Sequence, residues 1–249
     1  MRTIAYNVYA CDGWPRERTG SGNGKPVSSE LAEALIRLEP DIVTFSEAPA
    51  EATVREIARR LGHQAVFFPS GRQWPGALLT RYPVQTSMCG REISDDPAAF
   101  SRHAGRVTVT GPRGEMAVYS AHLHVNDAPI RGREIAALLA SVSDDIDSRR
   151  AVLLQGDLNH EPTDPEYGLW ESAGLTDTWV ARGTGTGPTI KADAPERRID
   201  YIWACAALAP KLRDVRVLSN RPFGAGGDGA ASPYYLSDHL PVLAEFAFD

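Results

Sequence analysis

Short apolar segments bounded by turn-forming or charged residues recur along this 249-residue chain and constrain its fold class. Residues 3–8 and 41–47 have the length and the β-branched content of buried strands. Each is followed, after a loop, by apolar residues at helical spacing, over residues 28–40 and 51–62. A strand–helix–strand–helix order is typical of a core that combines helices and sheets.

The ends of the two predicted helices carry residues that helix termini favour. Ser28 or Ser29 is expected to cap the first helix, which Pro40 ends. Gly62 is expected to close the second helix. The long loop before the first helix contains a glycine-rich stretch at residues 20–26, but its spacing does not match a phosphate-binding P-loop.

The remainder of the chain predicts mostly strands. Candidates are residues 65–68, 76–80, 84–88, 106–110, 115–122, 151–154, 199–203, 212–218 and 242–248. The turn at residues 111–114 predicts an antiparallel hairpin, and residues 130–146 have a helical pattern. No internal repeat or linker divides the sequence, so we expect residues 1–249 to form a single domain of mixed sheets with helices outside them.

Charge and cysteine content narrow the cellular setting. The formal charge of −6 argues against nonspecific binding to a polyanion, although an acidic protein can still have a local basic groove. The three cysteines are far apart and form no zinc-binding spacing, which favours a reducing compartment. No apolar run approaches the ~20 residues of a membrane span, so we expect a cytoplasmic protein.

The most informative strand end lies at residues 151–159. An apolar run leads into Gly156, which is expected to turn the chain, and then into Asp157 and Asn159. Alternate side chains of an extended chain point the same way, so this carboxylate and this amide are expected to share a face. An Asx turn that closes the strand would explain the same residues.

Other apolar strands end in polar residues of the same kind, namely Asn7, Glu47, His122, Asp200, Asp238 and His239. Each alone has a structural explanation, such as a turn, a surface ion pair or a buried histidine. Together they favour a site that hydrolyses a phosphate ester, because an anionic phosphate repels an attacking water unless positive charge screens it. Carboxylate oxygens suit Mg²⁺ or Mn²⁺ better than zinc.

With these residues, the sequence resembles the endonuclease/exonuclease/phosphatase superfamily, which includes pancreatic-type deoxyribonuclease, apurinic endonucleases, bacterial sphingomyelinases and inositol polyphosphate 5-phosphatases. The matching segments are residues 6–8, 41–47, 76–83, 121–123, 156–159, 198–202 and 237–241. The resemblance implies an α+β fold, a four-layer sandwich of two mixed β-sheets packed face to face with helices outside. It also implies a metal-dependent phosphoesterase with its metal at the strand ends.

Carried over position by position, the resemblance implies Glu47 as the principal metal ligand, with contributions from Asn7 and Asp238 and with Mg²⁺ or Mn²⁺ as the cofactor. Asp157 would orient or deprotonate the attacking water. Asn159 would bind the phosphate or hold that water.

The two histidines complete the implied site. His239 would contact the scissile phosphate while Asp200 holds its imidazole, and His122 would donate to a phosphate oxygen. Two departures count against the apurinic endonucleases: Tyr9 stands where they carry Asp, and His122 stands where they use Tyr.

The substrate is expected to be an anionic phosphate ester: a nucleic acid, a phospholipid headgroup or a small molecule. His124, Arg72 and Trp74 are candidate substrate-binding residues, and no protein partner is indicated. Three alternatives stay open: a nonspecific nuclease on DNA or RNA, a zinc hydrolase built on His122 and His124, and a non-catalytic binding domain on the same fold.

Overall fold

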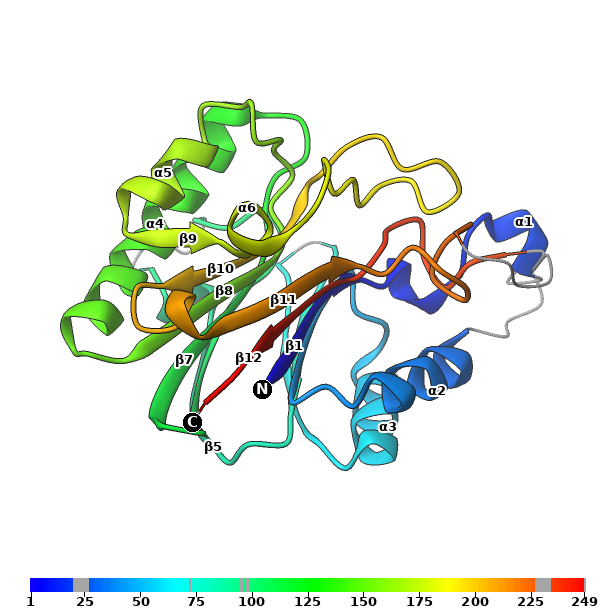
Figure 1. Ribbon diagram of the computed structural model, residues 1–249, viewed down its shortest axis with the longest axis horizontal. Coiled ribbons are helices and arrows are strands. Elements are labelled where there is room, and N and C mark those ends of the chain that lie inside the picture. Colours follow the sequence, from blue (N-terminus) through cyan, green and yellow to red (C-terminus); the bar gives the residue numbers. More distant parts are fainter. Residues whose placement is uncertain (20–26, 72, 95, 97–98, 227–233, 249) are drawn as a thin grey trace.

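Two six-stranded sheets pack face to face in the computed structural model, which describes residues 1–19, 27–71, 73–94, 96, 99–226 and 234–248 (Figure 1). The first sheet has the order β11-β12-β1-β2-β4-β3 and consists of β1 (Arg2–Asn7), β2 (Ile42–Ser46), β3 (Gln64–Phe68), β4 (Gly76–Thr80), β11 (Leu212–Val217) and β12 (Val242–Phe246). The second has the order β5-β6-β7-β8-β10-β9 and consists of β5 (Val84–Cys89), β6 (Ala104–Gly111), β7 (Gly114–His122), β8 (Ala151–Asp157), β9 (Leu175–Asp177) and β10 (Asp200–Cys205). Both are mixed, because β1 pairs parallel with β2, and β7 with β8, among antiparallel neighbours.

Helices cover the outer faces of both sheets, so the expected four-layer sandwich is confirmed (Figure 1). The helices are α1 (Arg16–Thr19), α2 (Ser28–Leu38), α3 (Glu51–Leu61), α4 (Ala128–Asp147), α5 (Tyr167–Ser172) and α6 (Thr178–Arg182), with short 3₁₀ segments η1 (Tyr9–Cys11), η3 (Gly90–Glu92) and η4 (Ala209–Lys211). The pair α2 and α3 lies on one side of the sandwich, whereas α4 and α5 lie on the other (Figure 1). None of the helices in the described part of the chain is long and apolar enough to cross a membrane.

The alternation of side chains along β2 divides the core into layers. Ile42 belongs to the apolar cluster between the sheets, whereas Val43 and Phe45 belong to the cluster under α2 and α3. A strand buried on both faces needs such a continuous apolar run, which is why residues 41–47 predict it correctly.

A polar contact fixes how the two sheets lie against each other. Gln155 of β8 accepts a hydrogen bond from the Thr3 hydroxyl at 2.7 Å and donates to Thr44 Oγ1 at 3.0 Å and to the Ile4 carbonyl at 3.1 Å. All of these side chains are buried, and buried polar groups are costly unless they are paired. Because Gln155 precedes Asp157 by two residues on the same strand, this contact brings the end of β8 beside the ends of β1 and β2.

Local expectations for two residues were wrong. Gly156 does not turn the chain but lies inside β8 at φ +143°, paired with Ala121 and Tyr201. A Cβ atom there would lie 2.1 Å from the Ala121 carbonyl oxygen, so glycine is required by close approach of the neighbouring strand. Ser28 lies within α2, and the N-cap residue is Val27, which provides no side-chain hydrogen bond.

Other local expectations were met. Gly62 closes α3 at φ +70°, and Gly111 pairs with Gly114 across the predicted hairpin. All three cysteines are free thiols. The glycine-rich stretch at residues 20–26 lies outside the described residues.

Candidate active site

Six of the predicted site residues meet at one end of the sandwich, where β1, β2, β7 and β8 end and β10 begins. They are Asn7, Glu47, His122, Asp157, Asp200 and His239. Each strand delivers its polar residue to the same edge because parallel neighbours end together and an antiparallel neighbour begins there.

Asn7 joins the two sheets at this edge. Its amide Nδ2 donates to Asp157 Oδ2 at 3.0 Å and to Glu47 Oε1 at 3.2 Å. The first contact crosses from one sheet to the other, and the second links the ends of two parallel strands. Asn7 therefore holds two carboxylates close together without neutralising either.

His239 and Asp200 form a buried ion pair, with His239 Nδ1 2.8 Å from Asp200 Oδ2. Burial alone lowers the pKa of His239, but Asp200, Asp157 and Asp238 together raise it to about 10. Burial raises the pKa of Asp200 to about 6, and His239 opposes that rise. At neutral pH the pair therefore consists of an imidazolium and a carboxylate.

His122 has the opposite charge state. Its Nε2 lies 3.3 Å from Asp157 Oδ2, yet burial lowers the pKa of His122 to about 4 despite the opposing effect of Asp157. Burial would raise the pKa of Asp157, but His122, His239 and Asn7 outweigh burial and hold this pKa well below its usual range. At neutral pH Asp157 is an anion beside a neutral imidazole.

Asn159 follows Asp157 in a tight turn. Its backbone N–H donates to Asp157 Oδ1 at 3.2 Å, and its side-chain Nδ2 donates to the Leu123 carbonyl at 3.0 Å. At φ +53° Asn159 is not extended, so the reasoning that placed both side chains on one face of a strand was wrong here. The Asx turn is present, and it brings the Asn159 amide beside the end of β7.

Non-glycine residues with positive φ cluster in the same region. Of the eight non-glycine residues with positive φ in the described chain, six adjoin these strand ends: Tyr9, Ala10, Cys11, Glu47, Trp74 and Asn159. Such conformations cost of order 1–3 kcal/mol each and persist where the surroundings impose them, most often at functional sites. Their concentration at one edge of the sandwich is therefore independent support for a functional site there.

Glu47 is the carboxylate best suited to hold a cation. Its Oε2 atom is buried and has no hydrogen-bond partner, and burial raises the pKa of Glu47 to about 7 against the effect of the Asn7 amide. A divalent cation at this oxygen would supply the missing partner. Half-buried Asp238 lies nearby and accepts a hydrogen bond from Ser237 Oγ at 3.3 Å.

A second group of ligand atoms fits a metal less well. Atoms of Asp157, Asp200 and His239 lie within 4.8 Å of one another, and theirs is the group with metal-binding spacing in the described part of the chain. However, His239 is protonated and its Nδ1 is bonded to Asp200, so its ring has no lone pair to offer. We therefore interpret this group as a hydrogen-bond network, and Glu47 is the better candidate for a metal ligand.

The structure places two of the three candidate substrate-binding residues in one pocket near the site. Trp74 and His124 line one pocket of about 370 Å³ with Gln73, Ser101 and Arg102. His124 Nδ1 accepts hydrogen bonds from the backbone N–H groups of Asn126 at 3.3 Å and Asp127 at 3.1 Å, so this nitrogen is not directed to a metal shared with His122. Arg72 lies outside the described residues.

Two residues of this region were missed. Arg102 donates a hydrogen bond to His122 Nε2, and the ring of buried His103 lies 6.2 Å from the His122 ring. Both lie just before β6, whereas the sequence pattern indicated site residues at the ends of apolar strands. The predicted hairpin contained the signal, because its register places residue 103 next to residue 122 on the adjacent strand.

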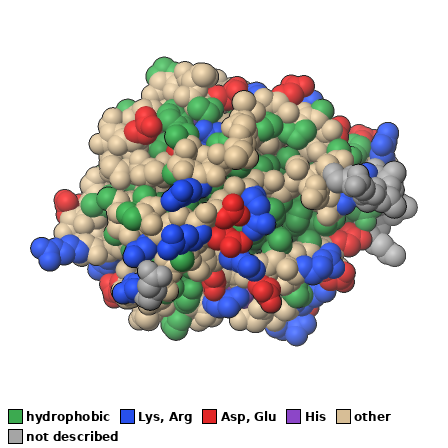
Figure 2. All heavy atoms as spheres, viewed as in Figure 1, with side chains coloured by type: hydrophobic (Ala, Val, Ile, Leu, Met, Phe, Trp, Pro, Cys, Tyr) green, Lys and Arg blue, Asp and Glu red, His purple; other side chains and the backbone are tan. Residues whose placement is uncertain are grey.

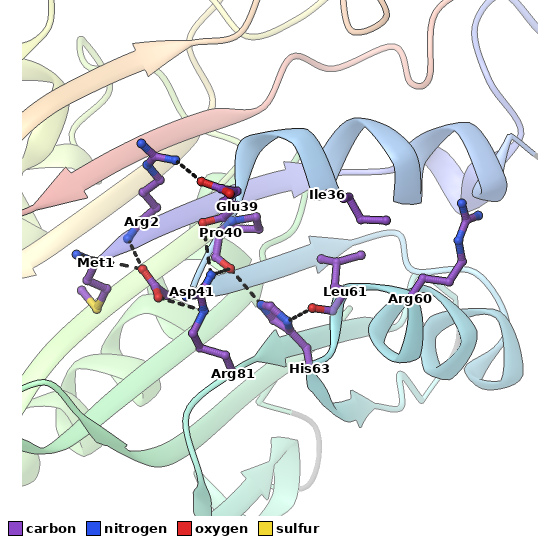
Figure 3. Close-up of a pocket in the computed structure, with 10 residues that line it drawn as sticks. All are labelled: Met1, Arg2, Ile36, Glu39, Pro40, Asp41, Arg60, Leu61, His63 and Arg81. Carbon is purple, nitrogen blue, oxygen red and sulfur yellow. Dashed lines mark hydrogen bonds and ion pairs between the residues drawn. The ribbon is translucent and has the colours of Figure 1, made fainter.

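A separate hollow of about 440 Å³ lies at the opposite end of the first sheet (Figure 3). Its arginines are already neutralised: Arg81 Nε lies 3.0 Å from Asp41 Oδ1, and Arg2 Nη1 lies 3.5 Å from Glu39 Oε2. The candidate site is therefore the other end of the sandwich, where the six residues described above meet.

A sequence profile of the Endonuclease/Exonuclease/phosphatase family matches residues 4–239. The chain belongs to this family. No curated protein matches the sequence. Solved structures similar to it include a mannosyl-6-phosphatase from Bacteroides thetaiotaomicron, with 17% identity, a TM-score of 0.79 and coverage of 100% of both chains.

Two further solved structures have the same fold. A 3′ phosphatase from Neisseria, bound to a product DNA hairpin, is 22% identical over 100% of both chains with a TM-score of 0.73. The catalytic domain of human Nocturnin with a bound sulfate anion is 20% identical, covers 100% of this chain and 93% of its own, and has a TM-score of 0.74.

Proposed function

We propose that the protein is a divalent-metal-dependent phosphoesterase in which Asp157 orients the attacking water. The observation that carries the proposal is the placement of Asp157, a buried carboxylate held by Asn7 and flanked by two histidines. Burying the Asp157 carboxylate beside the unpartnered oxygen of Glu47 costs folding free energy. Proteins tolerate such a cost mainly at functional sites.

Glu47, with Asn7 and Asp238, would hold Mg²⁺ or Mn²⁺. When bound, the ion screens the phosphate charge and stabilises the negative charge that develops during hydrolysis. The buried, unpartnered oxygen of Glu47 supports this assignment. The local hydrogen bonds of His124 make the alternative, a zinc hydrolase that uses His122 and His124, less attractive.

The roles that we propose for Asp157 and His239 follow from their protonation states at neutral pH. Asp157, as an anion, can accept a hydrogen bond from a water and so orient it for attack. His239, as a cation fixed by Asp200, can donate to a phosphoryl or leaving-group oxygen. His122 and Asn159 lie beside Asp157 and would contact the phosphate.

Charge favours a small anionic ester over a long polynucleotide. The chain has a formal charge of −6, and basic and acidic side chains are interspersed on the face shown in Figure 2. Extended nucleic acid is bound mainly through basic residues that neutralise successive phosphates. The similar structures include proteins described as acting on a sugar phosphate and on DNA, so both classes belong in the test.

The test is hydrolysis by the purified chain in MgCl₂ and in EDTA. The panel contains p-nitrophenyl phosphate, bis(p-nitrophenyl) phosphate, hexose phosphates, DNA, RNA and phospholipid. We expect magnesium-dependent release of product, and Asp157→Ala should lower kcat by about 100-fold or more. Asp214→Ala, a change at a half-buried carboxylate on β11 away from the site, is the control and should retain full activity. Equal negligible rates for wild type and Asp157→Ala on the whole panel would refute the proposal and favour a non-catalytic binding domain.

A further inference from the structure

Arg102 and Asp157 compete for one nitrogen of His122. The Arg102 guanidinium donates a hydrogen bond to His122 Nε2, and the same atom lies 3.3 Å from Asp157 Oδ2. A ring nitrogen either accepts a hydrogen bond or donates its proton, so it cannot satisfy both neighbours. An anionic group placed between them would take the guanidinium and leave His122 free to donate.

The charge of Arg102 is not neutralised locally. Its guanidinium hydrogen-bonds a histidine whose pKa burial lowers to about 4, and it forms no ion pair with any carboxylate in the described ranges. The arginines of the hollow in Figure 3 differ, since Arg81 and Arg2 face carboxylates. Arg102 therefore presents a full positive charge at the edge of the active site.

Hydrogen bonds from Ser101 to Glu134 of α4 hold the segment that carries Arg102 in place. Glu134 of α4 is fully buried, and its Oε1 accepts hydrogen bonds from the Ser101 N–H at 2.7 Å and the Ser101 hydroxyl at 2.6 Å. Its Oε2 accepts the His124 N–H at 2.8 Å. One carboxylate thus fixes two walls of the pocket that Arg102 lines, which gives the guanidinium a defined position beside β7.

We propose that Arg102 is a phosphate-binding residue that makes the site prefer a phosphate monoester over a diester. A monoester has three non-bridging oxygens and carries nearly two negative charges at neutral pH, whereas a diester carries one. The planar guanidinium fork matches two phosphate oxygens at once and gains more from the greater charge. This inference rests on the proposed phosphoesterase function and names its substrate class.

The test compares two substrates with the same leaving group, p-nitrophenyl phosphate and bis(p-nitrophenyl) phosphate. Arg102→Gln should lower kcat/KM for the monoester by about 100-fold and for the diester by about tenfold. Arg102→Lys should restore part of the loss, because lysine keeps the charge without the fork. The control is Arg91→Gln, an exposed arginine of the adjoining pocket of about 300 Å³ that should leave both rates unchanged.

A binding measurement makes the outcome independent of turnover. Calorimetry with inorganic phosphate and with dimethyl phosphate, in MgCl₂, should show that Arg102→Gln weakens phosphate binding by more than about tenfold and dimethyl phosphate binding far less. Unchanged melting temperatures would exclude misfolding of the variants.

The outcomes separate the two proposals. Equal losses for both esters, no loss in Arg102→Gln, or the same loss in Arg91→Gln would overturn the role of Arg102. A wild-type protein that hydrolyses no compound of the panel above but binds phosphate through Arg102 would overturn the proposed hydrolysis and retain the phosphate site. A wild-type protein that hydrolyses no compound of that panel and does not bind phosphate would overturn both.

Discussion

Acid should destabilise this protein through its buried histidines, and His160 offers the clearest test. This residue is 1% exposed, its Nε2 accepts a hydrogen bond from Trp170 Nε1 at 2.9 Å, and its ring stacks on Tyr201 with centroids 5.0 Å apart. Burial lowers the pKa of His160 from 6.5 to about 4. The folded protein therefore keeps this imidazole neutral at a pH where the unfolded chain does not.

The sign of the effect follows from proton binding. Between pH 6.5 and about 4, the unfolded chain binds a proton at His160 that the folded protein does not bind, so the free energy of unfolding falls as the pH falls. Each unit of pKa corresponds to about 1.4 kcal/mol, which makes the loss about 3 kcal/mol for this residue across the window. Burial also lowers the pKa of His103 to about 3 and that of His122 to about 4, which adds to the loss, whereas the raised pKa values of Glu47 and Asp200 oppose it.

The assay is urea unfolding of wild type and His160→Gln at several values from pH 7 to pH 4. The glutamine carbonyl oxygen can still accept from Trp170, but glutamine does not titrate. We expect the variant to lose about 3 kcal/mol less than wild type over this range. The control is Val142→Ala, which creates a cavity in the core and should lower stability equally at every pH. Identical pH dependence in wild type and His160→Gln would refute the reasoning.

Three further changes test other parts of the structure. Gly156→Ala should lower the free energy of unfolding by about 3 kcal/mol or more in urea, because a Cβ would meet a carbonyl oxygen at 2.1 Å; near-wild-type stability would contradict the observed close approach. Glu134→Gln should lower the melting temperature by about 5 °C in calorimetry, since an amide N–H would face the donors of Ser101 or His124, and an unchanged value would show that these bonds contribute little. Glu47→Gln should weaken Mn²⁺ binding by more than about tenfold in a calorimetric titration, and equal affinity would remove Glu47 from the ligand set.

The sequence predicts elements well where one stripe or face must be apolar over many residues. The helix Glu51–Leu61 and its closing Gly62 were predicted at their observed positions, because an amphipathic helix repeats its pattern over three turns. The short elements α5 (Tyr167–Ser172), β9 (Leu175–Asp177) and α6 (Thr178–Arg182) were not predicted. Too few residues repeat in them to give a period, and tertiary packing rather than propensity holds them.

Gly156 shows a limit of reading residue types one at a time. Glycine before an Asp and an Asn is most often a turn, yet here it is a strand residue that makes room for the neighbouring Ala121 carbonyl. The need for glycine arises from a strand that is distant in sequence. No local pattern can reveal it.

The positions of the site residues were more predictable than their charges. Polar residues at the ends of apolar strands could be expected to meet, because neighbouring strands share an edge, and Asn7, Glu47 and Asp157 do meet. Arg102 and His103 lie just before β6 instead, and the hairpin register places them at the site: the His122 N–H donates to the His103 carbonyl at 3.0 Å.

The two histidines of the candidate site, His239 and His122, have the same side chain, but their pKa values are shifted in opposite directions. His239 has Asp200 at 2.8 Å on one ring nitrogen and further carboxylates nearby, which raise its pKa to about 10 against burial. His122 is equally buried but faces a carboxylate shared with Asn7 and lies against the Arg102 guanidinium, and its pKa falls to about 4. One side of the site therefore has a permanent cation, and the other has a neutral ring. If the site binds a phosphate monoester, as proposed above, the positive charge on the second side would come from Arg102, which hydrogen-bonds His122, and not from His122 itself.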